Sequence, residues 1–221
     1  MIAEIEGNID DLINKLEMPD GEIPILPTKN LVLFPGVMLP ILIGKNPTAG
    51  QMLNAERDES IIGVVNQTNT DTETPEQGDM AQLGVFARVM KCIEMPGGMV
   101  TCIVQALGKM KIKTFHRLGK MLFATAEPIH EKNVYKNDME FKQACKNLKQ
   151  TTMKFIHANE DIPDESGMTL ESLNNDTLLI NFIASNLPFS TKAKLEMLET
   201  NELKERLFMI LRHLDRELQL I

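Results

Sequence analysis

The residues that could carry catalysis are scattered along this 221-residue chain and match no catalytic spacing. Gly44-Lys45 is followed by Asn46 and lacks the upstream glycine of a phosphate-binding loop. No G-x-S-x-G or H-E-x-x-H motif is present, and no pair of carboxylates stands out as a general acid and base. The histidines lie in both halves without metal-ligand spacing, at His116, His130, His157 and His213. We therefore expect no catalytic residue, no metal site and no cofactor in this stretch.

The three cysteines, an odd number with no C-x-x-C pair, argue against a disulfide framework or a zinc site. If a hairpin is centred on Gly97, Cys92 and Cys102 fall opposite each other, and we expect both to be buried, reduced and inert. No run of 18 apolar residues is present, so no membrane span is predicted. The first residues are acidic, unlike a signal peptide. These features predict a cytoplasmic protein.

The net charge of −8 disfavours an electrostatic grip on nucleic acid. One segment, between Glu94 and Glu127, has no acidic residue and five basic ones: Lys109, Lys111, Lys113, Arg117 and Lys120. The three lysines alternate with other residues, so on a strand they would share one face. The favoured interpretation is a solvated strand face that deters edge pairing. A site for phosphate or for an acidic partner is the alternative.

Residues 22–128 carry the signals of a β-rich domain. Two apolar runs, residues 23–33 and 37–43, are joined at Phe34-Pro35-Gly36. A helix is predicted near residues 47–57, and the polar residues 66–82 are expected to form a mobile surface loop. Further strands are predicted at residues 61–65, 85–94, 100–107, 109–115 and 121–126. Strands of this length with short glycine-containing turns predict an antiparallel, partly closed barrel.

From residue 137 the apolar period changes to that of helices, which predicts a helical domain over residues 137–221. One stripe is formed by Phe141, Ala144, Cys145, Leu148, Thr152, Phe155 and Ile156. Asn137, Asp176 and Ser190 are predicted to begin helices, and residues 170–173 a short turn. The polar residues 129–136 are expected to be a linker. A β-rich block followed by a helical block defines an α+β fold class.

The two ends of the chain add further expectations. Residues 1–21 are predicted to be an acidic extension, either a short amphipathic helix or disordered. At the other end an a/d seam is formed by Leu207, Leu211, Leu214, Leu218 and Ile221. The chain stops on that seam without a capping glycine or proline, which predicts that the helix continues in a longer protein.

Several motifs lie along residues 22–98: Glu22-Ile23-Pro24-Ile25-Leu26-Pro27, Phe34-Pro35-Gly36, Pro40 with Gly44, Leu83-Gly84-Val85 and the Pro-Gly-Gly turn at 96–98. Together they resemble the amino-terminal domain of Lon, the ATP-dependent protease. The resemblance covers roughly residues 22–221. It implies a PUA-like barrel and a non-catalytic domain that engages unfolded or damaged polypeptides and supports a hexamer. The parent would be a bacterial ATP-dependent serine endopeptidase of protein quality control, and only the parent would need ATP and Mg.

For a domain of this kind we predict a polypeptide-binding surface at Pro35, Val37, Met38, Met95 and Met99, where apolar side chains flank two turns. The chain holds 15 methionines, which suit adaptable apolar surfaces but also fill cores. The alternative for Val37 and Met38 is that both face the barrel core. A second hypothesis is a stand-alone PUA-like module that binds RNA or a small ligand. The absence of Trp and the single Tyr weigh against base stacking.

Overall fold

The computed structural model describes residues 17–44 and 47–221. The helix predicted within residues 1–16 lies outside the described residues. Between His130 and Glu131 the chain divides into two compact units, a β unit and a helical unit, and each is described by itself.

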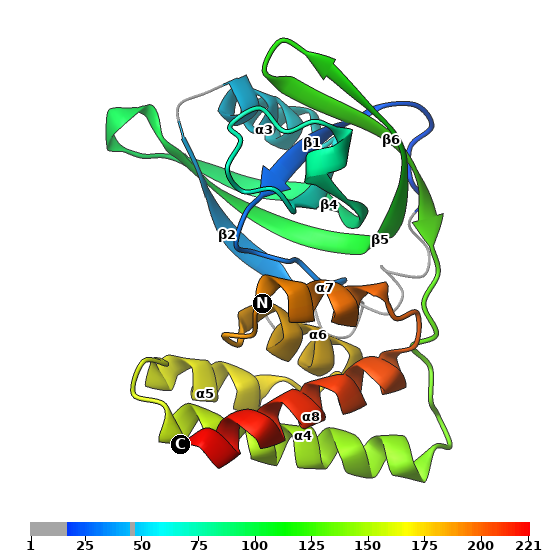
Figure 1. Cartoon of the computed structure of the whole chain (residues 1–221), viewed down its shortest axis with the longest axis vertical. Helices are drawn as coiled ribbons and strands as arrows, with labels where there is room; N and C mark the ends of the chain where they lie inside the picture. Colours follow the sequence, from blue (N-terminus) through cyan, green and yellow to red (C-terminus); the bar gives the residue numbers. More distant parts are fainter. Residues whose placement is uncertain (1–16, 45–46) are drawn as a thin grey trace. The chain divides into compact units, whose positions relative to one another are not determined.

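The β unit is a mixed sheet whose strands close into a ring (Figure 1). Its elements are β1 (Ile23–Thr28), β2 (Met38–Ile43), α3 (Pro47–Asp58), β3 (Ile61–Gln67), β4 (Met80–Glu94), β5 (Val100–Leu118) and β6 (Met121–Ile129), with single 3-10 turns at Gln77–Asp79 and Pro96–Gly98. The strand order is β2-β5-β4-β3-β1-β6, and a further pairing of β5 with β6 closes the ring. β2 is left outside the ring, paired only with β5 among the described strands.

The α+β class is confirmed, but one pairing departs from the all-antiparallel expectation. β1 and β3 are parallel, with Ile25 opposite Gly63 and Thr28 opposite Asn66. Between them the chain passes through β2 and α3, and a long crossover that contains a helix is the connection that parallel neighbours require. The strand signals of β1 and β3 could not reveal this, because direction is set by the connection.

The Phe34-Pro35-Gly36 turn has the geometry its residues predict. The Val37 amide donates to the Phe34 carbonyl at 3.1 Å, and Gly36 has a φ of 82°. Proline followed by glycine with positive φ is the signature of a type II turn. The strand predicted over residues 23–33 ends at Thr28, because the chain then turns. The buried Asn66 side chain holds that turn by donating to the carbonyls of Thr28, Lys29 and Leu31.

Residues 100–118 form one bent strand, β5, where the sequence predicted two. The apparent break, Gly108, lies opposite Phe86 in β4. A Cβ at this position would come within 2.6 Å of the Phe86 ring, so the glycine makes room for that ring and does not end the strand.

The polar segment after β3 is folded by its own hydrogen bonds, which the expectation of a mobile loop did not anticipate. The buried Gln67 side chain donates to the carbonyls of Asn69 and Thr72 at 2.7 and 2.6 Å. Asn69 donates to Asp79 at 2.8 Å, and Asp79 also accepts from the Glu76 amide at 2.9 Å. These bonds to the Asp79 carboxylate lower its pKa.

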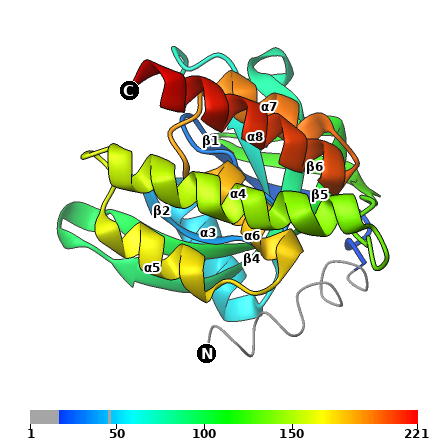
Figure 2. The same ribbon diagram turned by 90° about the horizontal axis from the view of Figure 1, so that it is seen from below.

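The helical unit contains α4 (Met139–Ala158), α5 (Asp164–Ser172), α6 (Asp176–Asn186), α7 (Thr191–Glu199) and α8 (Leu203–Leu220). The predicted α4 stripe is confirmed, since all seven of its residues are buried. Helices α4 and α8 pack together and run in the same general direction (Figure 2). Their first turns are joined by Lys204, whose Nζ lies 2.8 Å from Asp138 and 2.6 Å from Glu140.

Two of the three residues predicted to cap helix N-termini are wrong by one position. Asp138, not Asn137, caps α4 by accepting from the Phe141 amide, and Asn175, not Asp176, caps α6 by accepting from the Leu178 amide. In both cases the capping side chain lies three residues before the backbone amide whose hydrogen bond it accepts. Ser190 caps α7 as predicted.

Helix α5 was not predicted from the sequence, which indicated only a short turn at residues 170–173, where the helix ends. Its sequence is polar and contains Gly167, so local propensity is poor. Packing against α4 stabilises it instead.

Candidate functional site

The most exposed apolar surface of the β unit is one face of the three neighbouring strands β2, β5 and β4. Residues opposite one another in an antiparallel ladder project to the same side of the sheet. The register places Leu42, Thr101 and Ile93 in one row, and Pro40, Ile103 and Lys91 in the next. Met95 and Met99 extend this face at the hairpin tip, where the Met95 amide donates to the Met99 carbonyl at 2.7 Å. We call these eight residues together with Met38 the outer face.

Four large apolar side chains of the outer face are exposed to solvent, whereas Met38 and Ile103 are partly buried. Leu42 is 59% exposed and Ile93 is 47% exposed. Met95 and Met99 are 43% and 36% exposed, and Met90, at a register shift in β4, adds another exposed side chain. Apolar groups gathered on one face in this way characterise sites that bind other molecules.

The free edge of β2 is unsuited to strand addition because of Pro40. The Ala106 amide donates to the Val37 carbonyl at 3.0 Å, which makes Met38 and Gln105 a non-hydrogen-bonded pair. Since the two kinds of pair alternate, Pro40 and Ile103 are also non-hydrogen-bonded. The Pro40 nitrogen therefore points away from β5, where it breaks no ladder bond but offers no donor to an added strand. The outer face must act through side chains.

The five residues predicted as a binding surface are only partly brought together. Met38, Met95 and Met99 lie on the outer face, and the methionines of the hairpin are exposed. Pro35 and Val37 are buried, and Val37 is only 1% exposed, which corrects their assignment to an exposed surface. Val37 is the residue whose carbonyl pairs with Ala106 of β5, so it belongs to the packed turn.

Sequence reasoning missed Leu42 and Ile93. Leu42 lies in a run of apolar residues, MLPILI, that hides which alternate side chains face outward. The proline at position 40 was the available signal, because it marks an edge strand, and Leu42 is on the same side of that strand.

The basic segment of β5 does not form the single solvated face that its alternation predicted. Lys109 is buried, whereas Lys111, which is likewise flanked by β4 and β6, is exposed. Lys113 is exposed and pairs with Glu127 at 3.3 Å. The edge-protecting interpretation is therefore wrong for Lys109.

Two other residues of that segment line a cavity of about 270 Å³. Arg117 and Lys120 share it with Lys29 and Glu73, which pair at 2.9 Å. The Arg117 Nη2 atom is buried and has no hydrogen-bond partner among the residues that the structure describes. Three basic groups against one acidic group give the cavity a positive character, so the alternative of an anion site stays a prediction.

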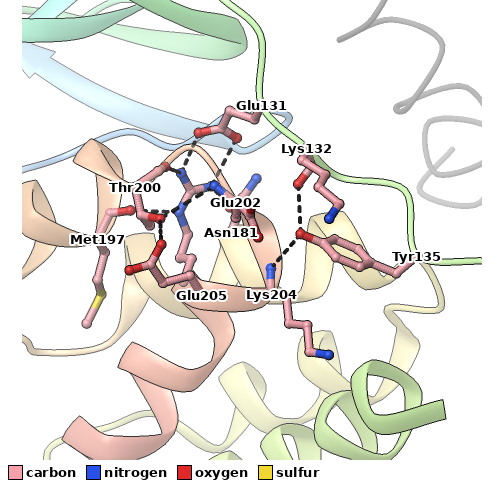
Figure 3. Close-up of polar contacts among 10 residues, drawn as sticks. Glu131, Lys132, Tyr135, Asn181, Met197, Thr200, Glu202, Lys204 and Glu205 are labelled. Atoms are coloured by element: carbon pink, nitrogen blue, oxygen red, sulfur yellow. Dashed lines mark hydrogen bonds and ion pairs between the residues drawn. The ribbon is translucent and has the colours of Figure 1, made fainter. Parts of the chain in front are cut away.

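The helical unit is organised around Arg206, a fully buried guanidinium. Figure 3 shows its partners Glu131, Asn181, Met197 and Thr200. Nε donates to the Met197 carbonyl at 2.9 Å, Nη1 donates to Asn181 at 2.8 Å, and Nη2 donates to the Thr200 carbonyl at 3.1 Å. The two remaining N–H groups make a bidentate pair with the carboxylate of Glu131, which is also nearly inaccessible. All five donors of the arginine are thereby used.

This network ties the predicted linker to the helical unit. Glu131 is held by Arg206, and the Lys132 backbone pairs with Asn201 and Leu203 at 2.8 and 3.0 Å. Tyr135 stacks on Phe141 with ring centroids 4.4 Å apart, and its hydroxyl accepts from the Lys204 amide. Residues 131–135 are consequently fixed by specific contacts, which their polar sequence concealed.

A second buried cation, Lys194 in α7, has a backbone carbonyl as its hydrogen-bond partner, and no described carboxylate pairs with it. Its Nζ donates to the Ser185 carbonyl at the end of α6 at 2.7 Å, and burial lowers its pKa to about 8. Between pH 8 and its ordinary pKa of 10.5 the unfolded chain holds a proton that the folded chain has released. Stability should therefore rise with pH in this window.

We expect the free energy of unfolding of the wild type, relative to Lys194→Met, to rise by roughly 2–3 kcal/mol between pH 7 and pH 10.5. Denaturant titrations at several pH values measure it. Lys192→Met, which removes an exposed lysine of the same helix, should show no such pH-dependent difference. Parallel pH profiles for the wild type and Lys194→Met would contradict the assignment.

Among residues 17–44 and 47–221, no cluster of His, Cys, Asp and Glu side chains is arranged to hold a metal ion. None of the helices in these residues has both the length and the apolar character needed to cross a bilayer.

A ring of strands followed by a helical unit places the chain in the class of two-part α+β domains. The model of the ATP-dependent protease La (LON) substrate-binding domain matches residues 22–216, and the chain belongs to this family. It is 33% identical to a Lon protease of Flavobacterium johnsoniae over 95% of this chain, and 32% identical to that of Parabacteroides distasonis over 96%. The chain spans about a quarter of the length of these relatives, 26% in both cases.

Solved structures show the same fold. The N-terminal domain of a Lon protease from the Mycobacterium avium complex superposes with a TM-score of 0.66 at 16% identity, covering 88% of this chain and 98% of that one. A Lon N-terminal domain protein from Xanthomonas campestris gives a TM-score of 0.63 at 14% identity, covering 87% and 98%.

Proposed function

We propose that this chain is the part of a bacterial ATP-dependent protease that binds unfolded or damaged polypeptides, and that it does so through the outer face. The observation that carries the proposal is the exposed row of Leu42, Thr101 and Ile93, which continues to Met95 and Met99 at the hairpin tip. Family membership supports the same role.

The composition of the outer face suits partners that share no sequence. Methionine side chains are flexible and polarisable, so they adapt to different apolar residues. Pro40 prevents pairing in a fixed strand register, so contacts are made by side chains. A folded protein keeps its apolar residues inside, whereas an unfolded chain presents them, and this difference supplies the selectivity.

The affinity of one domain should be modest, on the order of micromolar, because binding must offset the ordering of a flexible chain. In the complete protein, which we propose to be a cytoplasmic hexamer with ATPase and serine endopeptidase activities supplied by other parts of the chain, several copies would act together. Avidity would then raise the apparent affinity by roughly 10²–10⁴.

The test is a titration of the chain with a fluorescently labelled, permanently unfolded protein such as reduced and carboxymethylated α-lactalbumin, followed by anisotropy. We expect saturable binding that weakens less than about threefold between roughly 0.05 M and 0.5 M salt, because screening leaves apolar burial intact. Native α-lactalbumin and a single-stranded RNA should not bind.

Two results would contradict the proposal. Equal binding of native α-lactalbumin would show that unfoldedness is not recognised. A collapse of affinity at moderate salt would indicate instead that the basic cavity of Lys29, Arg117 and Lys120 holds the ligand.

A further inference from the structure

The two cysteines of the β4–β5 hairpin are placed for chemistry with one another. Cys92 lies opposite Cys102 in the ladder, and their Sγ atoms are 2.8 Å apart. The bond from the Met95 amide to the Met99 carbonyl makes Glu94 and Val100 a non-hydrogen-bonded pair, so Cys92 and Cys102, two residues further along, are the same kind of pair. Such pairs hold Cα atoms about 4.5 Å apart, within the range of roughly 4.4–6.8 Å found across disulfides.

The two thiols differ in their exposure to solvent, and this difference determines which of them reacts first. Cys92 is partly exposed, which corrects the prediction that both cysteines are buried, whereas Cys102 is fully buried. An external reagent therefore reaches Cys92 first. Burial raises the pKa of both thiols, and Glu56 of α3 adds to the effect at Cys92. Because the thiolate is the reactive form, the pair is slow to react at neutral pH and stays reduced in a reducing compartment.

We propose that Cys92 and Cys102 form a redox-sensitive site that closes to a disulfide when the chain meets an oxidised small disulfide such as glutathione disulfide. The Cys92 thiolate attacks one sulfur of glutathione disulfide and releases one glutathione thiolate, leaving a mixed disulfide. The Cys102 sulfur, already in contact, then gives up its proton and attacks the Cys92 sulfur, which releases the second glutathione. The chain loses two electrons and two protons, and one glutathione disulfide becomes two glutathione molecules.

The disulfide would join the strands on the side of the sheet opposite the outer face. Cys92 and Cys102 share a row with Ile41, which alternates with the row of Leu42, Thr101 and Ile93. Closure therefore leaves the outer face uncovered and restricts the hairpin that carries Met95 and Met99. The inference rests on the geometry of the hairpin and is independent of the proposed function.

The test is incubation of the whole chain in glutathione buffers from fully reduced to fully oxidised, then alkylation and mass spectrometry. We expect the oxidised wild type to have lost two hydrogens. Cys145, in which burial raises the thiol pKa to about 12, should be its remaining free thiol. The rate should rise about tenfold per pH unit at neutral pH, since it follows the thiolate fraction. The thermal midpoint should rise by several degrees on oxidation and fall back on reduction.

Single variants separate the two steps. In Cys102→Ala, Cys92 should stop at a stable mixed disulfide with glutathione, and in Cys92→Ala, Cys102 should remain free. The proposal is overturned if the folded wild type also stops at the mixed disulfide, or if both thiols remain alkylatable in the fully oxidised buffer.

Discussion

Replacing Arg206 by Met should destabilise the helical unit by about 3–5 kcal/mol, the range for breaking a buried ion pair by removing one partner. The variant leaves the buried Glu131 carboxylate without its cation, and Asn181 and the carbonyls of Met197 and Thr200 without the donor seen here. Each buried polar group that loses a hydrogen-bond partner adds to the cost. Tyr135, the only tyrosine in a chain without tryptophan, lies in this unit and reports its unfolding by fluorescence in a denaturant titration.

Variants of two other arginines in α8 are the controls. They test whether the loss of stability comes from the buried network or from the change in helix propensity and charge. Arg212→Met and Arg216→Met remove exposed arginines of the same helix and should change stability by less than about 0.5 kcal/mol. Combining Arg206→Met with Glu131→Leu should recover part of the loss, because no unpaired buried charge remains. A loss below about 1 kcal/mol for Arg206→Met alone would show that the network is not required for stability.

Replacing Leu42 and Ile93 together by Glu should weaken binding of an unfolded polypeptide by at least about tenfold, which corresponds to roughly 1.4 kcal/mol. Both side chains are about half exposed, so charges there interrupt the apolar row of the outer face while staying in water. For the same reason the thermal midpoint should change little. Anisotropy titrations and thermal unfolding of the same preparations measure the two effects.

The control for this variant is Met139→Glu with Met168→Glu, which adds the same charge at exposed methionines of the helical unit. That double variant should bind as the wild type does. Equal weakening by both would point to a general effect of negative charge, and unchanged affinity of Leu42→Glu with Ile93→Glu would remove the outer face from consideration. If the Glu variant unfolds, the corresponding Ser variant repeats the test without added charge.

Several features of this chain could be predicted from the sequence because they depend on interactions between residues close together in the chain. The α4 stripe is buried as predicted, since residues three and four apart on a helix share a face. The Pro35-Gly36 turn forms because proline presets one φ and glycine permits the positive one that follows. The pairing of Cys92 with Cys102 follows from the hairpin centre at Gly97. The motifs that resemble the family lie in the turns and strands of residues 22–98, within the range that the family model matches.

What the sequence left open depends on contacts between residues far apart in the chain. The buried Arg206 lies beside the apolar seam of α8, three residues after Leu203 and four before Ile210. Its burial is tolerable because a carboxylate 75 positions earlier, an amide side chain and two carbonyls accept from its five donors. The parallel pairing of β1 and β3 depends on the path through α3.

The outer face was hidden for a related reason. The sequence determined that β2 is apolar along its whole length, but which of its side chains meet solvent was decided by the strands beside it. A strand has two faces that its own residues do not distinguish when both are apolar. The tertiary structure buries Ile41 and Ile43 against the core and leaves Leu42 on the open side, and so it added Leu42 to a surface of which the sequence had indicated only the methionines.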